Sequence, residues 1–281
     1  MIEPRPDLQE HYGREGLLER LEALLSACGG REEAALARGD EFHPGGRAAT
    51  EELARLAGVA PGARVLDLGC GIGGPARWLR RLVGPGGAVT GVDVVAEYCR
   101  TARALSDRTA DTADIAIVQA DAVAAELPGL RFDLVWSQHA QMNVADKAGW
   151  VAAVHRHLRP GGRYACFESF AGPGGAPHYP VPWAAGEGAS WLVTPDAWRA
   201  LLEAGGFTVV RWQDHTDATV AWLDASVAVQ KALAAAGDPA AALNVGLLLG
   251  PDAAVMSRHL RQNLVEGRLR AFMGVFELPA A

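Results

Sequence analysis

Hydrophobic and polar positions along the chain predict short strands separated by helices. From residue 64 onward, short runs rich in β-branched and aromatic residues recur, and longer stretches with helical spacing lie between them. This alternation is typical of parallel strands joined by right-handed crossovers, and it predicts an α/β three-layer sandwich. The runs expected to form strands are residues 64–68, 88–92, 114–119, 132–137, 163–169 and 207–213.

Helix patterns and turn signals fit between these runs. The clearest helix pattern, ADKAGWVAAVHRHL at residues 145–158, has Trp150, Val151 and Val154 on one face. VGPGG at 83–87 and LRPGG at 158–162 predict turns at helix ends.

Two helical segments lie outside the alternating pattern. Leucines at residues 17, 18, 21, 24 and 25 predict an N-terminal helix that stops before Gly29 and Gly30. Two more helix patterns, at 219–237 and 251–267, fill the stretch before the last apolar run. We expect residues 1–40 to form a helical lid and 41–281 the main domain, whose insertion at 215–268 is a second lid or a dimer interface.

A glycine-rich loop follows the first predicted strand. Gly69, Gly71 and Gly74 in VLDLGCGIGG have the G-x-G-x-x-G spacing, and the next helix is expected near Pro75. Backbone can approach a ligand closely there, and the helix N-terminus presents free N–H groups. Asp67 would sit poorly beside a pyrophosphate but suits a cofactor with an ammonium and a sulfonium. The alternative is that Asp67 only caps the turn.

VLDLGCGIGG resembles the first motif of class I S-adenosylmethionine-dependent methyltransferases. The likeness covers roughly residues 40 to 215. It implies a Rossmann-like, seven-stranded, mostly parallel sheet whose antiparallel last strand is LRAFMGVFEL at 269–278. By this resemblance Asp93 binds both ribose hydroxyls and Asp121 contacts the adenine amine. The residues expected to bind S-adenosyl-L-methionine are Asp67, Gly69, Cys70, Gly71, Asp93, Val94, Asp121, Ala122 and Gln138.

Two residues beyond the fourth and fifth strands are candidates for catalysis. Open α/β sheets bind ligands at this carboxyl edge. His139 could be a general base near neutral pH, or a packed, hydrogen-bonded histidine. Glu168 ends an apolar strand, where an ionised carboxylate is costly without a partner. We interpret Glu168 as a base, with a structural salt bridge as the alternative; methyl transfer itself requires no metal.

The substrate is expected to contact residues near the same edge. Met142 and Asn143 follow the fourth strand, and the loop AGPGGAPHYPVPW at 171–183 is either functional or an ordinary surface loop. Family likeness places Tyr12 above the sulfonium and FHPGGR at 42–47 over the cofactor carboxylate, although turn or core roles fit equally. The predicted substrate-binding residues are Tyr12, Met142, Asn143, His178, Tyr179 and Trp183.

The expected function is methyl transfer to a small molecule, by an enzyme similar to glycine, sarcosine and phosphoethanolamine N-methyltransferases and natural-product enzymes. N- or O-methylation is the broad expectation. One alternative is C-methylation of an alkene, with a carbocation over aromatic faces and Glu168 removing a proton. A protein of another class, which binds the cofactor or cyclises a substrate without transfer, is a further alternative, and a nicotinamide dehydrogenase is a third.

Composition and charge limit the binding partners and the cellular location that we expect for this protein. A net charge of −7 argues against non-specific nucleic-acid binding. No apolar stretch is long enough for a bilayer and no signal peptide is visible, so we expect a cytoplasmic protein without membrane contact. Four cysteines without C-x-x-C spacing are interpreted as structural. His155 and His157 point apart on their helix, so no metal is expected, whereas a homodimer fits the helical insertion.

Overall fold

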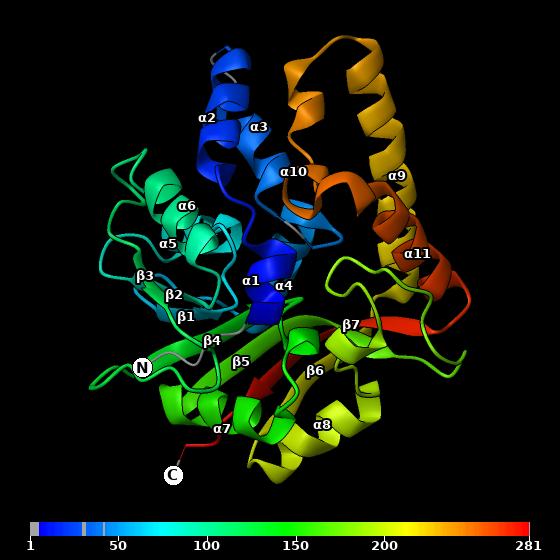
Figure 1. Cartoon of the computed structure of the whole chain (residues 1–281). Coiled ribbons are helices and arrows are strands. Elements are labelled where there is room, and N and C mark those ends of the chain that lie inside the picture. The colour runs from blue at the N-terminus through cyan, green and yellow to red at the C-terminus, as the bar shows by residue number, and fades with distance from the viewer. Residues whose placement is uncertain (1–5, 30–31, 42, 281) are drawn as a thin grey trace.

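A computed structural model describes residues 6–29, 32–41 and 43–280, and a seven-stranded sheet forms its centre (Figure 1). The strand order is β3-β2-β1-β4-β5-β7-β6, and β7 runs antiparallel to both of its neighbours. The predicted mostly parallel sheet with an antiparallel last strand is confirmed. The strands are β1 (Arg64–Leu68), β2 (Ala88–Asp93), β3 (Ala116–Gln119), β4 (Phe132–Gln138), β5 (Leu158–Ala171), β6 (Thr208–Asp214) and β7 (Leu269–Glu277).

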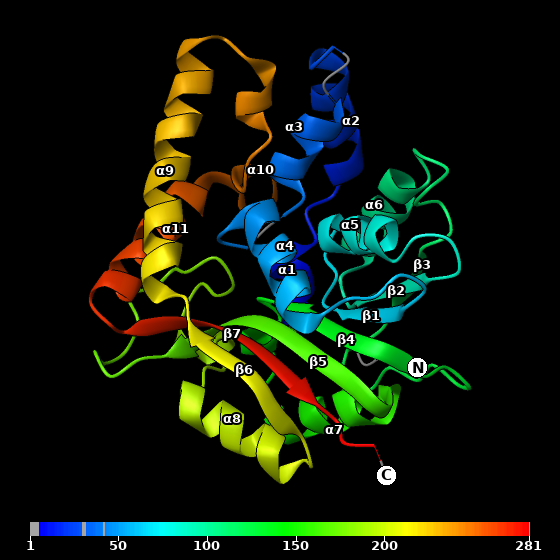
Figure 2. The same ribbon diagram turned by 180° about the vertical axis from the view of Figure 1, so that it is seen from behind.

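Helices cover both faces of the sheet, which gives the three predicted layers. One face carries α4 (Gly46–Ala57), α5 (Gly74–Val83) and α6 (Ala96–Ser106), and the other carries α7 (Lys147–His157) and α8 (Pro195–Ala204), as Figures 1 and 2 show.

Alternate side chains of β1 point to opposite faces, as the strand pleat requires. Val65 packs in the core under α4 and α5, whereas Leu66 and Leu68 pack in the core on the α7 side. Asp67 therefore projects toward the same face as Val65.

A cap layer rises above the α4 side of the sheet (Figures 1 and 2). It contains α1 (Pro6–Tyr12), α2 (Leu17–Ala27), α3 (Glu32–Gly39), α9 (Thr216–Ala235), α10 (Gly246–Leu249) and α11 (Ala253–Val265). Leu17, Leu21 and Leu25 of α2 share a core with Leu243 and Leu248. The N-terminal helices and the insertion before β7 thus build one cap. The short 3₁₀ segments are η1 (Gln141–Asn143), η2 (Glu187–Ala189), η3 (Pro239–Ala242) and η4 (Gly250–Asp252).

One predicted turn belongs to a strand. Residues 158–162 were expected to be a turn, but β5 begins at Leu158, which pairs with Phe132 of β4. The register shifts between Phe132 and Leu134, so the glycines are taken up in a bulge. Among the described helices, none is both long and apolar enough to cross a membrane.

Candidate functional site

A cavity of about 1260 Å³ lies between the carboxyl ends of β1, β2 and β4 and the cap layer. The loop after β1 forms its floor, and α1, α3, α9, α10 and α11 contribute to its walls. All nine residues predicted to hold the cofactor line this cavity: Asp67, Gly69, Cys70, Gly71, Asp93, Val94, Asp121, Ala122 and Gln138.

The glycine loop is fixed to the end of β2 by hydrogen bonds. The Gly69 N–H donates to the Val92 carbonyl at 2.8 Å. The Asp93 carboxylate accepts from the Gly71 N–H at 2.8 Å and from the Val95 N–H at 2.9 Å. Gly69, at φ 79°, lies so close to the next loop that a Cβ would be 2.5 Å from the Cβ of Ala140. Glycine is therefore required here both for backbone conformation and for space.

Asp67 and Asp93 place two buried carboxyl groups without a cationic partner in the cavity floor. Asp67 is 2% exposed, and its Oδ2 has no hydrogen-bond partner in the described part of the chain. Burial, with the nearby charges of Asp93 and Glu41, raises the pKa of Asp67 to about 8. Burial also raises the pKa of Asp93, against the lowering effect of its backbone hydrogen bonds. A bound cation would stabilise the ionised form of both groups.

Gln138 and Asp121 offer further polar groups. The Gln138 Oε1 accepts from the Trp136 indole at 2.9 Å and lies 3.2 Å from the Thr50 hydroxyl oxygen. Its Nε2 donor is buried without a partner among the described residues. Asp121 accepts from the Val123 N–H at 2.8 Å, which fixes the carboxylate after β3.

A buried hydrogen-bond network at the start of α4 forms another part of the cavity wall. From the sequence, only residues 42–47 were expected there, over the cofactor carboxylate. Glu41 accepts hydrogen bonds from Arg47 at 2.6 Å and Thr50 at 2.7 Å, and its other contact is His43 at 2.9 Å. Burial tends to raise the pKa of Glu41, but these partners together lower it to about 2. His43 and Arg47 line the cavity, as the prediction for 42–47 requires, whereas Phe42 lies outside the described residues.

His139 faces the cavity in a strained backbone conformation. Its φ of 50° is in the left-handed region, which a non-glycine residue rarely adopts. Its Nδ1 lies 3.2 Å from the Ser169 hydroxyl, and its Nε2 has no partner in the described part. Burial, with the proximity of His43, lowers the pKa of His139 well below its usual value. The ring is therefore neutral near pH 7.

Glu168 lies behind the cavity and does not line it. It shares one face of β5 with Tyr164, Cys166 and Phe170, which pack in the core on the α7 side. Its carboxylate accepts from the Ser137 hydroxyl at 2.7 Å and from the Ala140 N–H at 3.0 Å. The predicted role of Glu168 as a base stays a prediction without support from this geometry.

Burial raises the pKa of Glu168 to about 7, although its hydrogen bonds and Lys147 lower it. Lys147 does not form the direct salt bridge that was the alternative for Glu168, because its ammonium donates to the Gln141 carbonyl. The contacts of Glu168 instead fix the backbone immediately after His139.

The predicted substrate residues divide into two groups. Tyr12, Met142, Asn143 and Trp183 line the cavity, and Tyr12 interacts with Asn143. His178 and Tyr179 are not among the lining residues.

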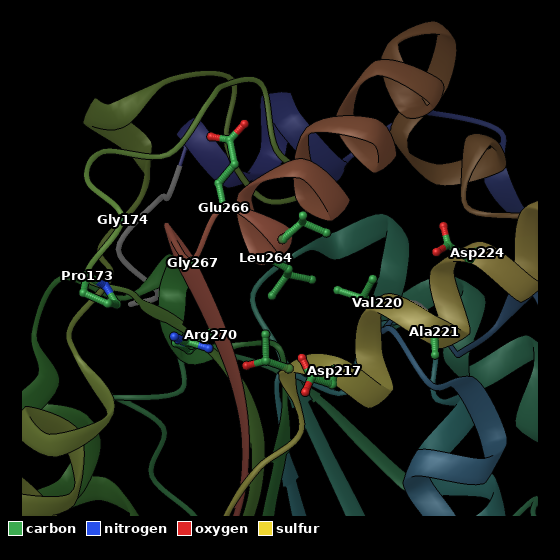
Figure 3. A pocket seen from close by; sticks show the side chains of 12 residues that line it. Pro173, Gly174, Asp217, Val220, Ala221, Asp224, Leu264, Glu266, Gly267 and Arg270 are labelled. Carbon is green, nitrogen blue, oxygen red and sulfur yellow. The ribbon is translucent and has the colours of Figure 1, made fainter.

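His178 is instead held in place by α11. Its ring contacts Glu266 at 2.9 Å, and its backbone N–H donates to Asn263 at 2.7 Å. Glu266 lines a second, more open hollow of about 770 Å³ at the base of α9 and α11 (Figure 3). Glu266 and Asp224 in this hollow are paired with Arg268 and Arg261, so neither acid is available for a ligand without breaking an ion pair.

Sequence reasoning expected the insertion to be a lid or a dimer interface, but it named none of the residues with which the insertion lines the cavity. Trp222 and Leu223 of α9, Leu248 of α10 and Leu260 of α11 all line it. The helical spacing of these apolar residues was visible in the sequence, but it did not show which face of each helix points toward the sheet.

Residues 65–162, which contain the glycine loop, Asp93, Asp121 and His139, match the family model described as "Methyltransferase domain". Over this segment, about a third of its length, the chain is similar to a methyltransferase domain. In the described ranges, no cluster of side chains that could hold a metal ion occurs, and this includes the surroundings of His155 and His157.

Curated relatives resemble this chain over the same region. The sterol 24-C-methyltransferase ERG6B of Gibberella zeae is 31% identical over 116 residues, which are 41% of this chain and 30% of that protein. The ubiquinone/menaquinone biosynthesis C-methyltransferase UbiE of Pseudomonas paraeruginosa is 36% identical over 116 residues, 40% of this chain and 44% of that protein. The match thus spans less than half of either relative.

A solved structure extends the likeness to the cap. The phosphoethanolamine N-methyltransferase 2 of Haemonchus contortus aligns with a TM-score of 0.67 at 19% identity, covering 94% of this chain and 59% of that one. At this identity the alignment shows a common fold.

The raised pKa values of Asp67 and Glu168 predict that stability falls as pH rises. A carboxyl group whose pKa is higher in the folded state contributes stability below its unfolded pKa of about 4, and loses it as pH passes the folded value. Those values are about 8 for Asp67 and about 7 for Glu168. Urea unfolding should give a free energy of unfolding lower by about 2 to 4 kcal/mol at pH 8.5 than at pH 5. Asp67→Asn should show a smaller difference, and an unchanged pH dependence would contradict the assignment.

Gly69→Ala should destabilise the protein through contact with Ala140. Gly62 is a matched control, because its φ of 81° is similar to the 79° of Gly69 but nothing lies within 4 Å of a Cβ there. Both alanines meet backbone strain of about 1 kcal/mol, and only Gly69→Ala adds a clash worth about 1 to 3 kcal/mol. Thermal unfolding measures both variants, and equal losses would show that the contact is easily relieved.

Proposed function

We propose that this chain transfers a methyl group from S-adenosyl-L-methionine to a small-molecule acceptor. The observation that carries the proposal is the buried pair Asp67 and Asp93, which lie in the floor of a cavity beside a glycine loop. No cationic side chain is among the groups that shift their pKa values. A ligand that carries an ammonium and a sulfonium supplies the missing positive charge.

The residues of the floor fit this cofactor. Asp93 can accept hydrogen bonds from ribose hydroxyls, while its present bonds to Gly71 and Val95 hold it in position. Asp121 and Ala122 line the cavity after β3, where an adenine would be contacted. The unpartnered Oδ2 of Asp67 and Nε2 of Gln138 are an acceptor and a donor without protein partners in the described residues. A typical ligand pocket measures about 300–1000 Å³, so 1260 Å³ leaves room for an acceptor as well.

When bound, the cofactor supplies an electrophilic methyl group with a neutral thioether as its leaving group. The protein must then align the acceptor and keep its lone pair free. His139 is our candidate for the second task, because it lines the cavity and its neutral ring has a buried Nε2 without a partner among the described residues, which could take a proton from an amine or hydroxyl. We assign His139 as the general base and Glu168 as a positioning residue.

The environment of His139 favours N- or O-methylation. C-methylation remains a second candidate, since the rings of Tyr12, Trp183 and Trp222 line the cavity and could stabilise a carbocation. In that case a group other than Glu168 would have to remove the proton. A cofactor-binding protein that transfers no methyl group is not favoured, because the matched family and both curated relatives are methyltransferases.

Tyr12, Met142, Asn143 and Trp183 are proposed to contact the acceptor. We also propose that the cap layer, within residues 1–40 and 215–268, covers the bound ligands and excludes water. His11 of α1 contacts the Pro182 carbonyl at 2.9 Å, and His259 of α11 contacts the Pro180 carbonyl at 3.1 Å, so both halves of the cap hold the 171–183 loop. The homodimer, the cytoplasmic location and the absence of nucleic-acid partners stay predictions.

Binding of S-adenosylmethionine near pH 7 should release a proton. Asp67 is largely protonated in the unliganded protein, since its pKa is about 8, and a cationic ligand lowers that pKa. Titration calorimetry in buffers with different ionisation enthalpies should show release approaching one proton. The neutral thioether S-adenosylhomocysteine should release less.

Asp67→Asn should abolish most of this release and weaken S-adenosylmethionine binding by about tenfold or more. Asp196→Asn, an exposed position on α8, is the control and should leave binding unchanged. Proton release that persists in Asp67→Asn would assign the titrating group elsewhere.

His139→Gln should lower turnover by about 10²-fold while the affinity for S-adenosylhomocysteine is retained. An acceptor is first identified by S-adenosylhomocysteine release that requires its presence. For an amine acceptor, raising the pH should partly restore turnover, because the acceptor then deprotonates without a base.

The exposed His155 on α7 provides the matched control, His155→Gln, which should have wild-type turnover. Glu168→Gln tests the positioning role, since it should lower stability and raise the KM of the acceptor while keeping a wild-type pH profile. Loss of the alkaline rescue in His139→Gln would remove the general-base assignment.

A further inference from the structure

Three basic side chains lie on the exposed part of the cavity wall. Arg38 belongs to α3, Lys231 to α9 and Arg258 to α11, and all three line the cavity. Within the described residues, none of them has an acidic partner or a hydrogen bond. In Figure 1, α3 lies to the left of α9 and α11. The three cations therefore come from separate elements around the same cavity, on its solvent-exposed side, which we call the mouth.

The other cationic groups of the lining are already neutralised. Arg47 is paired with Glu41 at 2.6 Å, and Arg261 is paired with Asp224 at 2.5 Å. Two acids of the lining, Asp67 and Asp93, are buried in the floor. The cavity thus has acidic groups at the floor and basic groups at the mouth, in a chain whose net charge is −7.

An apolar wall joins the two charged ends. Trp183, Trp222 and Leu223 line the cavity together with Leu248 and Leu260 from the cap. A ligand with its reacting end near His139 would lie along these side chains before it reaches the mouth. Burial of an apolar body there would supply affinity, whereas the cations would fix orientation.

We propose that the methyl acceptor is an amphipathic anion. Its apolar body lies along the cap helices, and its carboxylate or phosphate group lies among Arg38, Lys231 and Arg258. The identification of this anion as the methyl acceptor rests on the proposed function. The anion site itself does not depend on methyl transfer and can be measured without it. The separation of charge also places the cationic cofactor at the floor and the anionic ligand at the mouth, so neither competes for the other's position.

Two fluorescent probes test the anion site. 8-Anilinonaphthalene-1-sulfonate is an apolar anion, and N-phenyl-1-naphthylamine is a similar aromatic molecule without the sulfonate. Fluorescence titration of the full chain saturated with S-adenosylhomocysteine should give tighter binding of the sulfonate. Its affinity should fall as salt is raised, because the cations are exposed and their interactions are screened. The neutral probe should show little salt dependence.

The triple variant Arg38→Gln, Lys231→Gln, Arg258→Gln should weaken sulfonate binding by about tenfold and leave the neutral probe unchanged. Arg211→Gln is the control, because Arg211 is exposed on β6 and does not line the cavity. Thermal unfolding checks that the variants are folded. Equal binding of both probes, or sulfonate binding that survives in the triple variant, would overturn the proposal.

Displacement of the sulfonate by laurate, dodecyl phosphate and dodecanol separates the sources of charge. The two anions should compete better than the alcohol in the wild type and lose that advantage in the triple variant, and the stronger of them identifies the headgroup. Equal competition by all three would also overturn the proposal. S-adenosylhomocysteine binding is measured separately by calorimetry. Its absence would contradict the proposed function, whereas its presence with no preference for anions would contradict only the present inference.

Discussion

The buried carboxylate of Asp93 holds together the part of the molecule on which the cavity depends. It accepts one N–H from the glycine loop after β1 and one from the start of the segment leading to α6. Two chain segments from neighbouring strands are thereby fixed at the carboxyl edge of the sheet. The same carboxylate adds negative charge beside Asp67, whose Oδ2 has no partner in the described structure. The floor is therefore held in position by hydrogen bonds and keeps an unpartnered carboxyl oxygen, as a preorganised site for a cation requires.

A second buried network supports the opposite wall. The Trp150 indole donates to the Tyr164 hydroxyl at 3.2 Å, which lies 2.8 Å from the Ser137 hydroxyl. Ser137 donates to Glu168, which also accepts the Ala140 N–H directly after His139. This chain of contacts over-determines a backbone that would otherwise avoid the φ of 50° at His139. The strain is local, but the groups that hold it lie in the core on the far side of the sheet.

Features set by local sequence were predictable, whereas features set by these long-range contacts were not. The strands were predictable because buried parallel strands are short apolar runs, and the glycine loop because spacing and position fix its conformation. Glu168 was correctly placed at the end of a strand. However, alternate residues of a strand share a face, so Glu168 lies with Tyr164, Cys166 and Phe170 on the face away from the cavity. His178 was misleading for another reason: its partner Glu266 is 88 residues away, and no local pattern reveals such a contact. The helices α1, α3 and α10 are too short for a periodic signal to identify them.

The cap shows how distant segments become one functional surface. Leucines of α2 pack with Leu243 and Leu248 from the insertion, so neither half can move far without exposing apolar surface of the other. The charged residues at the mouth sit on both halves, Arg38 on one and Lys231 and Arg258 on the other. While the mouth is empty, these positive charges repel one another across the two halves of the cap. An anion bound among them would attract all three, so the net electrostatic interaction between the halves would become favourable. The shared core thus joins the two halves of the cap, and an anion at the proposed site would bridge them a second time.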